Sequence, residues 1–229
     1  METDRPDQTE CPFMVKKGYF QAEMGFNKNR EEGENNFNTP STLWKYGLTK
    51  GLELRYVTNV TLASESRFQQ EAIGFKVKLA EPRTYVPRTS LIVHYNLRDD
   101  KRDVSDKNTK PHSLGQAVFT LQHDLYKELG MGYNFGCEIH ENGYVEGIYR
   151  ISPGINLGDK WYAYVEVFGR FPNTMVTDHW FDGGIAYYLS DNIKADLSAG
   201  KSFTSGENWY LALGFSFRFQ LFNVAKRKS

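Results

Sequence analysis

The sequence predicts an all-β protein, a transmembrane antiparallel up-and-down β-barrel of about twelve strands. Three observations predict it. Apolar and polar residues alternate with a period of two from residue 19 to residue 219, as in strands with two unlike faces. The polar face carries many charges, whereas the middle of the apolar face carries none. The connections between these runs alternate between tight turns and longer polar loops.

The first half of the chain contains six alternating runs. In the first run, Phe20, Ala22 and Met24 share one face, and Gln21 and Glu23 share the other. The same pattern predicts strands over residues 44–48, 52–56, 73–79, 91–97 and 117–122. Many apolar positions hold aromatic or β-branched side chains, which favour strands.

The second half repeats the pattern six times. Its predicted strands cover residues 129–138, 145–151, 163–167, 181–189, 193–198 and 211–219. In the last run, Leu213, Phe215 and Phe217 oppose Gly214 and Ser216. Helical periodicity of comparable length is absent from the sequence, and no run approaches the roughly 20 apolar residues of a spanning helix.

The connections predict the two rims of the barrel. Residues 49–51, 158–160 and 190–192 have the composition of tight turns. Longer polar loops are expected at roughly Lys28–Pro40, Ser64–Gln69, Arg98–Ser113 and Phe171–Thr177. Short turns on one rim and long loops on the other are typical of bacterial outer-membrane barrels. An even number of strands places both termini on the short-turn rim, which faces the periplasm.

The distribution of charge predicts that the apolar face contacts lipid and the polar face lines a lumen. An arginine or lysine at the bilayer midplane costs about 2–4 kcal/mol, so lipid contact requires an apolar face without charges. The alternative is a soluble β-sandwich or lipocalin-like barrel with its apolar face inward. The lumen-facing candidates are Glu23, Lys45, Glu53, Arg55, Lys76, Lys78, His94, Glu138, Glu146, Arg150, Glu166, Asp182, Lys194, Asp196 and Arg218. Apart from His94, seven are acidic and seven are basic, which argues against strong charge selectivity.

Composition narrows the function classes. The 28 basic and 28 acidic residues balance, so the chain lacks the basic excess typical of nucleic-acid partners. The mean hydropathy of −0.58 suits a barrel with a polar lumen. The first ten residues are acidic and polar, so they do not form a signal peptide. We expect a mature exported chain to which Met1 has been added, located in the outer membrane of a Gram-negative bacterium.

Four segments resemble a known family. Thr3–Glu10 and Lys17–Glu23 are similar to the opening of the bacterial outer-membrane transporter family named for a "putative MetA pathway of phenol degradation". Trp44–Arg55 and Asp182–Gly200 resemble two of its hairpins. The resemblance spans nearly the whole chain. It implies an outer-membrane barrel, and its name implies an aromatic substrate class.

These observations lead to three domain-scale expectations. Residues 1–17 form an N-terminal periplasmic segment that plugs the barrel through Arg5 or Asp7, or else a disordered tail. Residues 18–219 form the barrel, and residues 220–229 form a C-terminal tail. The aromatic last strand has the character of a signal read by the barrel-assembly machinery, although the chain continues beyond Phe219.

The first functional hypothesis is a channel or passive transporter for small, aromatic or hydrophobic molecules. The second is a closed structural or ligand-binding barrel, and the third is a membrane-embedded lipid-modifying enzyme. The third is disfavoured because no histidine has a serine at recognisable spacing. We therefore expect no enzymatic activity, no catalytic or metal-binding residues and no cofactor. The expected partners are outer-membrane lipid, the assembly machinery and a small solute.

Overall fold

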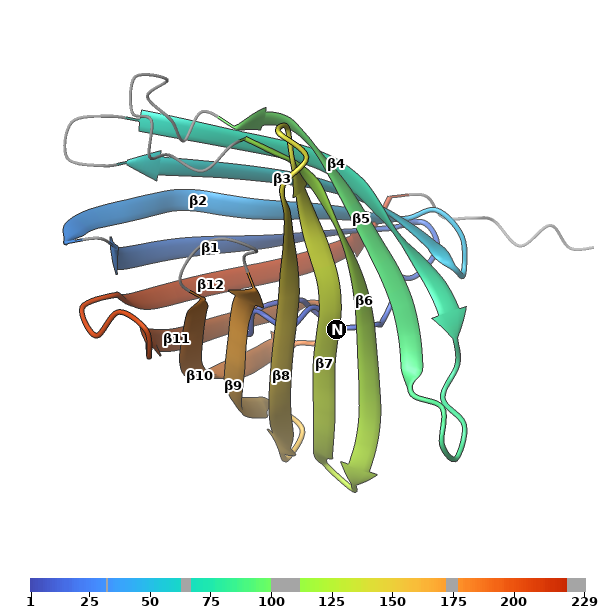
Figure 1. The fold of residues 1–229 in the computed structure, drawn as a ribbon. Helices are drawn as coiled ribbons and strands as arrows, with labels where there is room; N and C mark the ends of the chain where they lie inside the picture. The colour runs from blue at the N-terminus through green and yellow to red at the C-terminus, as the bar shows by residue number, and fades with distance from the viewer. Residues whose placement is uncertain (32, 63–66, 100–111, 172–176, 222–229) are drawn as a thin grey trace, which may run out of the picture.

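Twelve strands build the protein, seen here in a computed structural model that describes residues 1–31, 33–62, 67–99, 112–171 and 177–221 (Figure 1). The strands are β1 (Tyr19–Glu31), β2 (Glu34–Gly47), β3 (Leu52–Leu62), β4 (Arg67–Ala80), β5 (Arg88–Asp99), β6 (Ser113–Tyr126), β7 (Leu129–His140), β8 (Val145–Leu157), β9 (Trp161–Phe171), β10 (Asp178–Ser190), β11 (Ile193–Ser202) and β12 (Trp209–Gln220). Each run of alternating residues falls on one of these strands, with Leu48 just beyond the end of β2, so the predicted strand number is confirmed.

The strands pair in sequence order and close into a barrel. Every strand is antiparallel to its neighbours, and β12 returns to pair with β1. The closing register runs from Tyr19 opposite Gln220 to Arg30 opposite Trp209. Closure leaves no edge strand with unpaired backbone groups, which is the condition for a β-sheet to cross lipid. No helix in the described part of the chain is long and apolar enough to span a bilayer.

The two faces of the wall differ as the alternation predicts. Large apolar side chains such as Phe75, Phe135 and Leu213 are exposed on the outside. Charged side chains such as Lys76 and Glu166 are buried on the inside. This is the reverse of a soluble sandwich, in which apolar residues fill the interior. The apolar exterior and the closed barrel make this an outer-membrane barrel.

The two rims also differ, and the structure corrects two of the predicted loops. Both ends of the barrel sequence and the short connections at 48–51, 127–128 and 158–160 lie on one rim. The loop predicted over Lys28–Pro40 is wrong, because β1 continues to Glu31 and β2 begins at Glu34. Polar pairs such as Asn29 with Asn36 extend this hairpin after the apolar alternation has ended. The predicted loop Ser64–Gln69 extends too far, because β4 begins at Arg67. Residues 64–66, 100–111 and 172–176 of the remaining predicted loops, and residues 222–229 of the predicted tail, lie outside the described residues.

Candidate functional site

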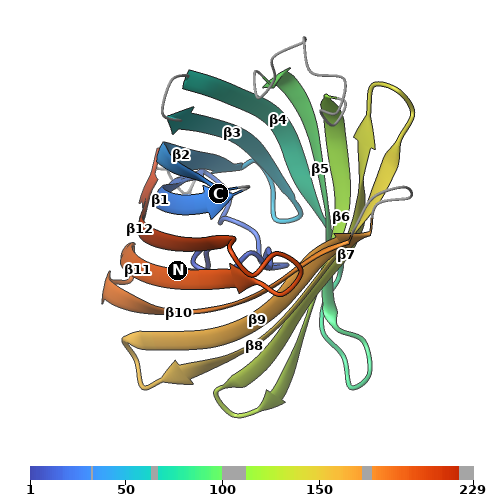
Figure 2. The ribbon, with the colours of Figure 1, turned by 60° about the vertical axis from the view of Figure 1, so that its left-hand side comes forward.

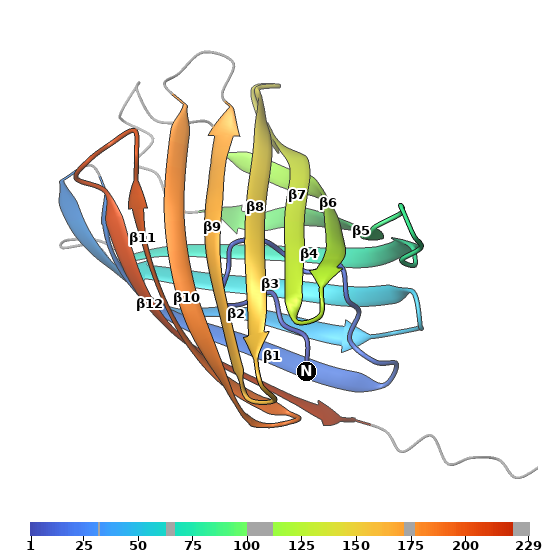
Figure 3. The ribbon, with the colours of Figure 1, turned by 90° about the horizontal axis from the view of Figure 1, so that it is seen from below.

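Residues 1–17 precede the first strand; the segment runs inside the barrel and ends at the rim, where Lys16 and Lys17 are exposed (Figures 2 and 3). Thr3, Asp4 and Thr9 are buried there. The segment leaves the lumen along β2, where the Gly18 N–H donates to the Gly47 carbonyl at 2.8 Å. The lumen is therefore occupied by the chain's own N-terminal residues.

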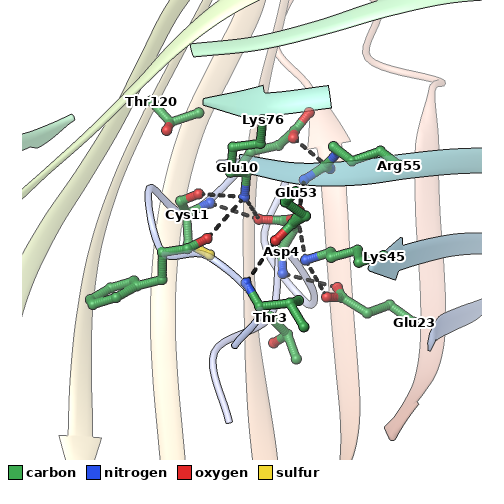
Figure 4. Close-up of polar contacts among 12 residues, drawn as sticks. Thr3, Asp4, Glu10, Cys11, Glu23, Lys45, Glu53, Arg55, Lys76 and Thr120 are labelled. Carbon is green, nitrogen blue, oxygen red and sulfur yellow. Dashed lines mark hydrogen bonds and ion pairs between the residues drawn. The ribbon is translucent and has the colours of Figure 1, made fainter. Parts of the chain in front are cut away.

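Asp4 is the centre of the ion pairs on the β1–β4 side of the lumen (Figure 4). Its carboxylate lies 2.5 Å from Lys45 Nζ, 3.0 Å from Arg55 Nη1 and 3.3 Å from Lys76 Nζ. Its backbone N–H donates to Glu23 at 2.9 Å. These four wall residues come from four successive strands, so one segment residue links four strands.

The cations around Asp4 keep it ionised. Burial by itself disfavours a charged carboxyl, but Lys45, Lys76 and Arg55 outweigh burial and hold the pKa of Asp4 well below its usual range. Burial likewise opposes ionisation of Glu10, and Arg55 at 2.8 Å lowers the pKa of Glu10. The segment thus supplies negative charge where the wall presents three buried cations.

Arg5 binds at the seam where β1 pairs with β12 and the barrel closes. Its guanidinium lies 3.0 Å from the Asp196 carboxylate of β11. Gly25 of β1 and Gly214 of β12 are direct partners across the seam. A Cβ atom added at either glycine would overlap the Arg5 side chain. Two glycines on the luminal face therefore make the space that Arg5 occupies.

The β8–β10 side of the lumen holds the next residues of the segment mainly through Glu166. Its carboxylate accepts hydrogen bonds from the Gln8 N–H, at 2.7 Å, and from the Thr9 hydroxyl. Asp7 accepts longer contacts, at 3.4 Å, from the hydroxyls of Ser152 and Tyr162. Burial and the neighbouring Glu166 raise the pKa of Asp7 well above its usual range. Asp7 therefore differs from Asp4 in having no wall cation within ion-pair distance among the described residues.

The structure places most lumen-facing candidates in contact with one another or with the segment. The buried ones are Glu23, Lys45, Glu53, Arg55, Lys76, His94, Glu146, Glu166, Asp182, Lys194 and Asp196. Arg150 is partly exposed and lies 3.7 Å from Glu10. Lys78 and Arg218 lie at the short-turn rim, where they contact Glu81 and the 191–192 turn. Glu138 lies toward the opposite rim.

Sequence reasoning missed uncharged residues that hold the segment. Ser90 donates to the Pro12 carbonyl at 2.7 Å, and Tyr164 donates to the Pro6 carbonyl at 3.2 Å. Asn134 both accepts from the Glu10 N–H and donates to the Glu10 carbonyl. Each lies on the polar face of its strand, so the alternation contained the signal. It could not say which polar residues would meet the segment.

A second ionic cluster lies near the long-loop rim. Glu138, His140 and Glu146 offer ligand atoms within 4.8 Å of one another, a spacing that suits a metal ion. The guanidinium of Arg170, which sequence reasoning also missed, contacts both carboxylates. An internal cation thus already balances these two acids.

A cavity of about 250 Å³ opens toward the short-turn rim, lined by Thr9, Gly132, Tyr162, Tyr188 and neighbouring residues. His123 contacts the Tyr133 hydroxyl and His179 contacts the Tyr149 hydroxyl, so neither histidine is directed at a serine by these contacts. The arrangement is suited to binding and passage, with polar and aromatic walls.

Comparisons with known proteins agree with this architecture. Residues 3–219 match the model of the family described as "Putative MetA-pathway of phenol degradation". The COG4313 outer membrane channel from Pseudomonas putida F1 has a TM-score of 0.60 at 9% identity, over 95% of this chain and 100% of that one. The KdgM porin has a TM-score of 0.57 at 9% identity, over 86% and 99%. A comparison with curated proteins gives no match.

These likenesses show the fold at low sequence identity. Together with the apolar exterior, the barrel places the chain in the bacterial outer membrane. The solved structures cited above are a channel and a porin.

Proposed function

The chain belongs to the family described as "Putative MetA-pathway of phenol degradation", and on this premise we propose that it is a passive outer-membrane channel for small molecules, held closed by residues 1–17. The observation that carries the proposal is the ionic seat of the segment. Asp4 pairs with Lys45 of β2, and Arg5 pairs with Asp196 of β11, so each segment charge meets a wall charge of opposite sign. A barrel whose interior needed only to be filled could use apolar side chains, whereas paired charges line a water-filled path once the segment leaves.

The composition of the lumen favours the passage of small solutes with weak selectivity for charge. The predicted luminal charges balance, and a strongly selective pore would present one dominant sign. Tyr162, Tyr164 and Tyr188 supply aromatic surface beside the segment. The family name points in the same direction, toward aromatic molecules. We assign the chain a small aromatic or hydrophobic solute as its cargo.

A transport role accounts for the site without enzymatic chemistry. Nucleophilic catalysis needs a base oriented toward a serine or similar group. The buried His94 instead accepts a hydrogen bond from Arg55 at 3.1 Å and contacts Gln116. We therefore propose a protein without catalytic residues, cofactor or nucleic-acid partner.

Two further partners follow from the same architecture. Outer-membrane lipid covers the exposed apolar wall, which includes Leu213 and Phe215 of β12. The aromatic alternation of that strand, ending at Phe219, is the feature that the barrel-assembly machinery would recognise.

The test is single-channel conductance in a planar bilayer, with the full chain and with a variant lacking residues 1–17. We expect low conductance from the full chain and steady conductance from the truncated barrel. Heat-modifiable gel mobility checks that the truncated barrel is folded. Folded but silent truncated protein would contradict the channel and favour a closed structural or ligand-binding barrel. Full conductance from both proteins would contradict the plug.

A further inference from the structure

A separate pocket lies at the short-turn rim, where the N-terminal segment leaves the lumen. It measures about 410 Å³, a volume within the range of small-molecule sites. Residues 12–17 form one wall. Lys50 from the β2–β3 turn, Lys78 from β4 and Arg88 from β5 form the other. Figures 1 and 3 show the β2–β3 and β4–β5 connections at one rim. We call this the rim pocket.

The rim pocket is strongly cationic. Five basic side chains line it and no acidic one does. They are Lys16, Lys17, Lys50, Lys78 and Arg88. Within the described chain, Lys16, Lys17 and Lys50 have no carboxylate within ion-pair distance. Such a set of unneutralised cations attracts anions into the pocket.

Glu81, beside the rim pocket, shows how two of the cations would hold an anion. Its carboxylate lies 2.6 Å from Lys78 Nζ and 2.7 Å from Arg88 Nη1. Lys78 and Arg88 are therefore already placed to share one carboxylate. Glu81 itself is 54% exposed, so it can turn away when a second anion arrives.

The rest of the rim pocket is apolar. Pro12, Phe13, Met14 and Val15 line it. The Arg88 guanidinium stacks over the Phe13 ring at 4.5 Å from the centroid, which holds the ring at the boundary between the charged and apolar parts. A ligand that fills both parts carries an anionic group on an apolar body.

We propose that the rim pocket binds small organic anions, with the carboxylate at Lys50, Lys78 and Arg88 and the apolar body against Phe13. This assigns a ligand class and a second site to the protein. The site rests on the docked position of residues 12–17, but not on whether the lumen conducts.

The orientation of the rim pocket favours a solute over a lipid. Lys78 lies two residues after the buried Lys76, and Arg88 lies two residues before the buried Ser90. Because strand side chains alternate, Lys78 and Arg88 share the luminal face with those residues. The rim pocket therefore opens toward the aqueous mouth of the barrel and away from the acyl chains.

Isothermal titration of the full-length protein in detergent with benzoate tests the proposal. Benzamide, the neutral isostere, should bind at least tenfold more weakly, and so should inorganic phosphate, which lacks an apolar body. Lys50→Gln should weaken benzoate binding at least threefold, whereas Glu81→Gln should strengthen it by freeing Lys78 and Arg88. The matched control is Lys160→Gln, an exposed lysine in another turn of the same rim.

Three results would overturn the proposal. They are benzamide binding as tightly as benzoate, phosphate binding as tightly as benzoate, and an equal loss of benzoate affinity in Lys160→Gln and Lys50→Gln.

Phosphatidylglycerol added to the micelles should leave benzoate affinity unchanged, and competition would assign the rim pocket to a lipid headgroup instead. Phe13→Ala should weaken benzoate without weakening phosphate, and an unchanged benzoate affinity would remove the apolar part of the site. None of these measurements depends on conductance, so they fail or succeed separately from the channel.

Discussion

At the scale of single residues, Asp4 determines how the segment is held. One carboxylate neutralises cations from β2, β3 and β4 in a buried site. Removing one partner of a buried ion pair costs about 3–5 kcal/mol, because the other charges stay buried without compensation. We therefore treat Asp4 as the residue whose loss should release residues 1–17 most strongly.

We predict that Asp4→Asn increases the rate of maleimide labelling of Cys11 at least tenfold. Cys11 lies in the segment, and burial raises the pKa of its thiol well above the usual value, which should slow its reaction with maleimide while the segment is docked. Labelling is measured in a Cys137→Ser background. Asp159→Asn, in an exposed turn, is the matched control and should leave the rate unchanged. Equal rates in wild type and Asp4→Asn would show that Asp4 does not hold the segment.

The same residue sets the response of docking to acid. A carboxyl whose pKa is depressed in the docked state stabilises that state above its ordinary pKa, and this stabilisation is lost as the pH falls through the depressed value. The ordinary value is about 3.9. The Asp4 contacts should therefore persist at pH 4 and above and weaken only in stronger acid.

At the scale of elements, the surroundings of each strand face decide which side chains it carries: apolar toward lipid and polar toward the lumen. The alternation predicted where each strand crosses lipid, because an apolar outer face is required there. It did not predict how far β1 and β2 continue beyond lipid, since Asn29 and Asn36 are polar although their backbones remain paired. Backbone pairing needs no apolar side chain once water surrounds the strand.

We predict that Leu213→Arg, in the middle of β12, lowers the free energy of unfolding by about 2–4 kcal/mol, and that Leu157→Arg, at the end of β8, lowers it by at most about 1 kcal/mol. Both leucines are exposed on the outer wall, at 58% and 54%. The depth in the bilayer should therefore decide the cost. Urea unfolding in lipid vesicles measures both, and equal costs would contradict a lipid-facing exterior.

At the scale of the whole molecule, docking of residues 1–17 should decide whether the barrel conducts. A Cβ atom at Gly132 would lie 3.1 Å from Thr9 Cγ2. This is close to the distance of about 3 Å between a sulfur atom and its partner's Cβ across a disulfide. We predict that Thr9→Cys with Gly132→Cys, in a Cys11→Ser and Cys137→Ser background, stays silent when oxidised and gains conductance events when reduced. Serine at position 132 serves as the control without a crosslink. Equal conductance in both redox states would contradict gating by the segment.

The whole molecule also shows where sequence reasoning stops. The period of two predicts twelve strands and the two faces of the wall, because those depend on local sequence alone. The luminal charges led to the hypothesis that Arg5 or Asp7 pairs with them, with a disordered tail as the alternative. The structure places Arg5 against Asp196, at a separation of 191 residues. Nothing in the local pattern encodes such a pairing, which depends on how the closed barrel aligns distant strands.

The seam between β1 and β12 has a consequence for the order of assembly. Gly25 and Gly214 come from the first and last strands, and together they form the seat of Arg5. That seat exists only after the two ends of the barrel sequence have met. A nascent barrel with an open seam therefore cannot hold Arg5 in this way, and Arg5 can reach this position only after closure. The position of Arg5 thus distinguishes a completed barrel from one whose seam is still open.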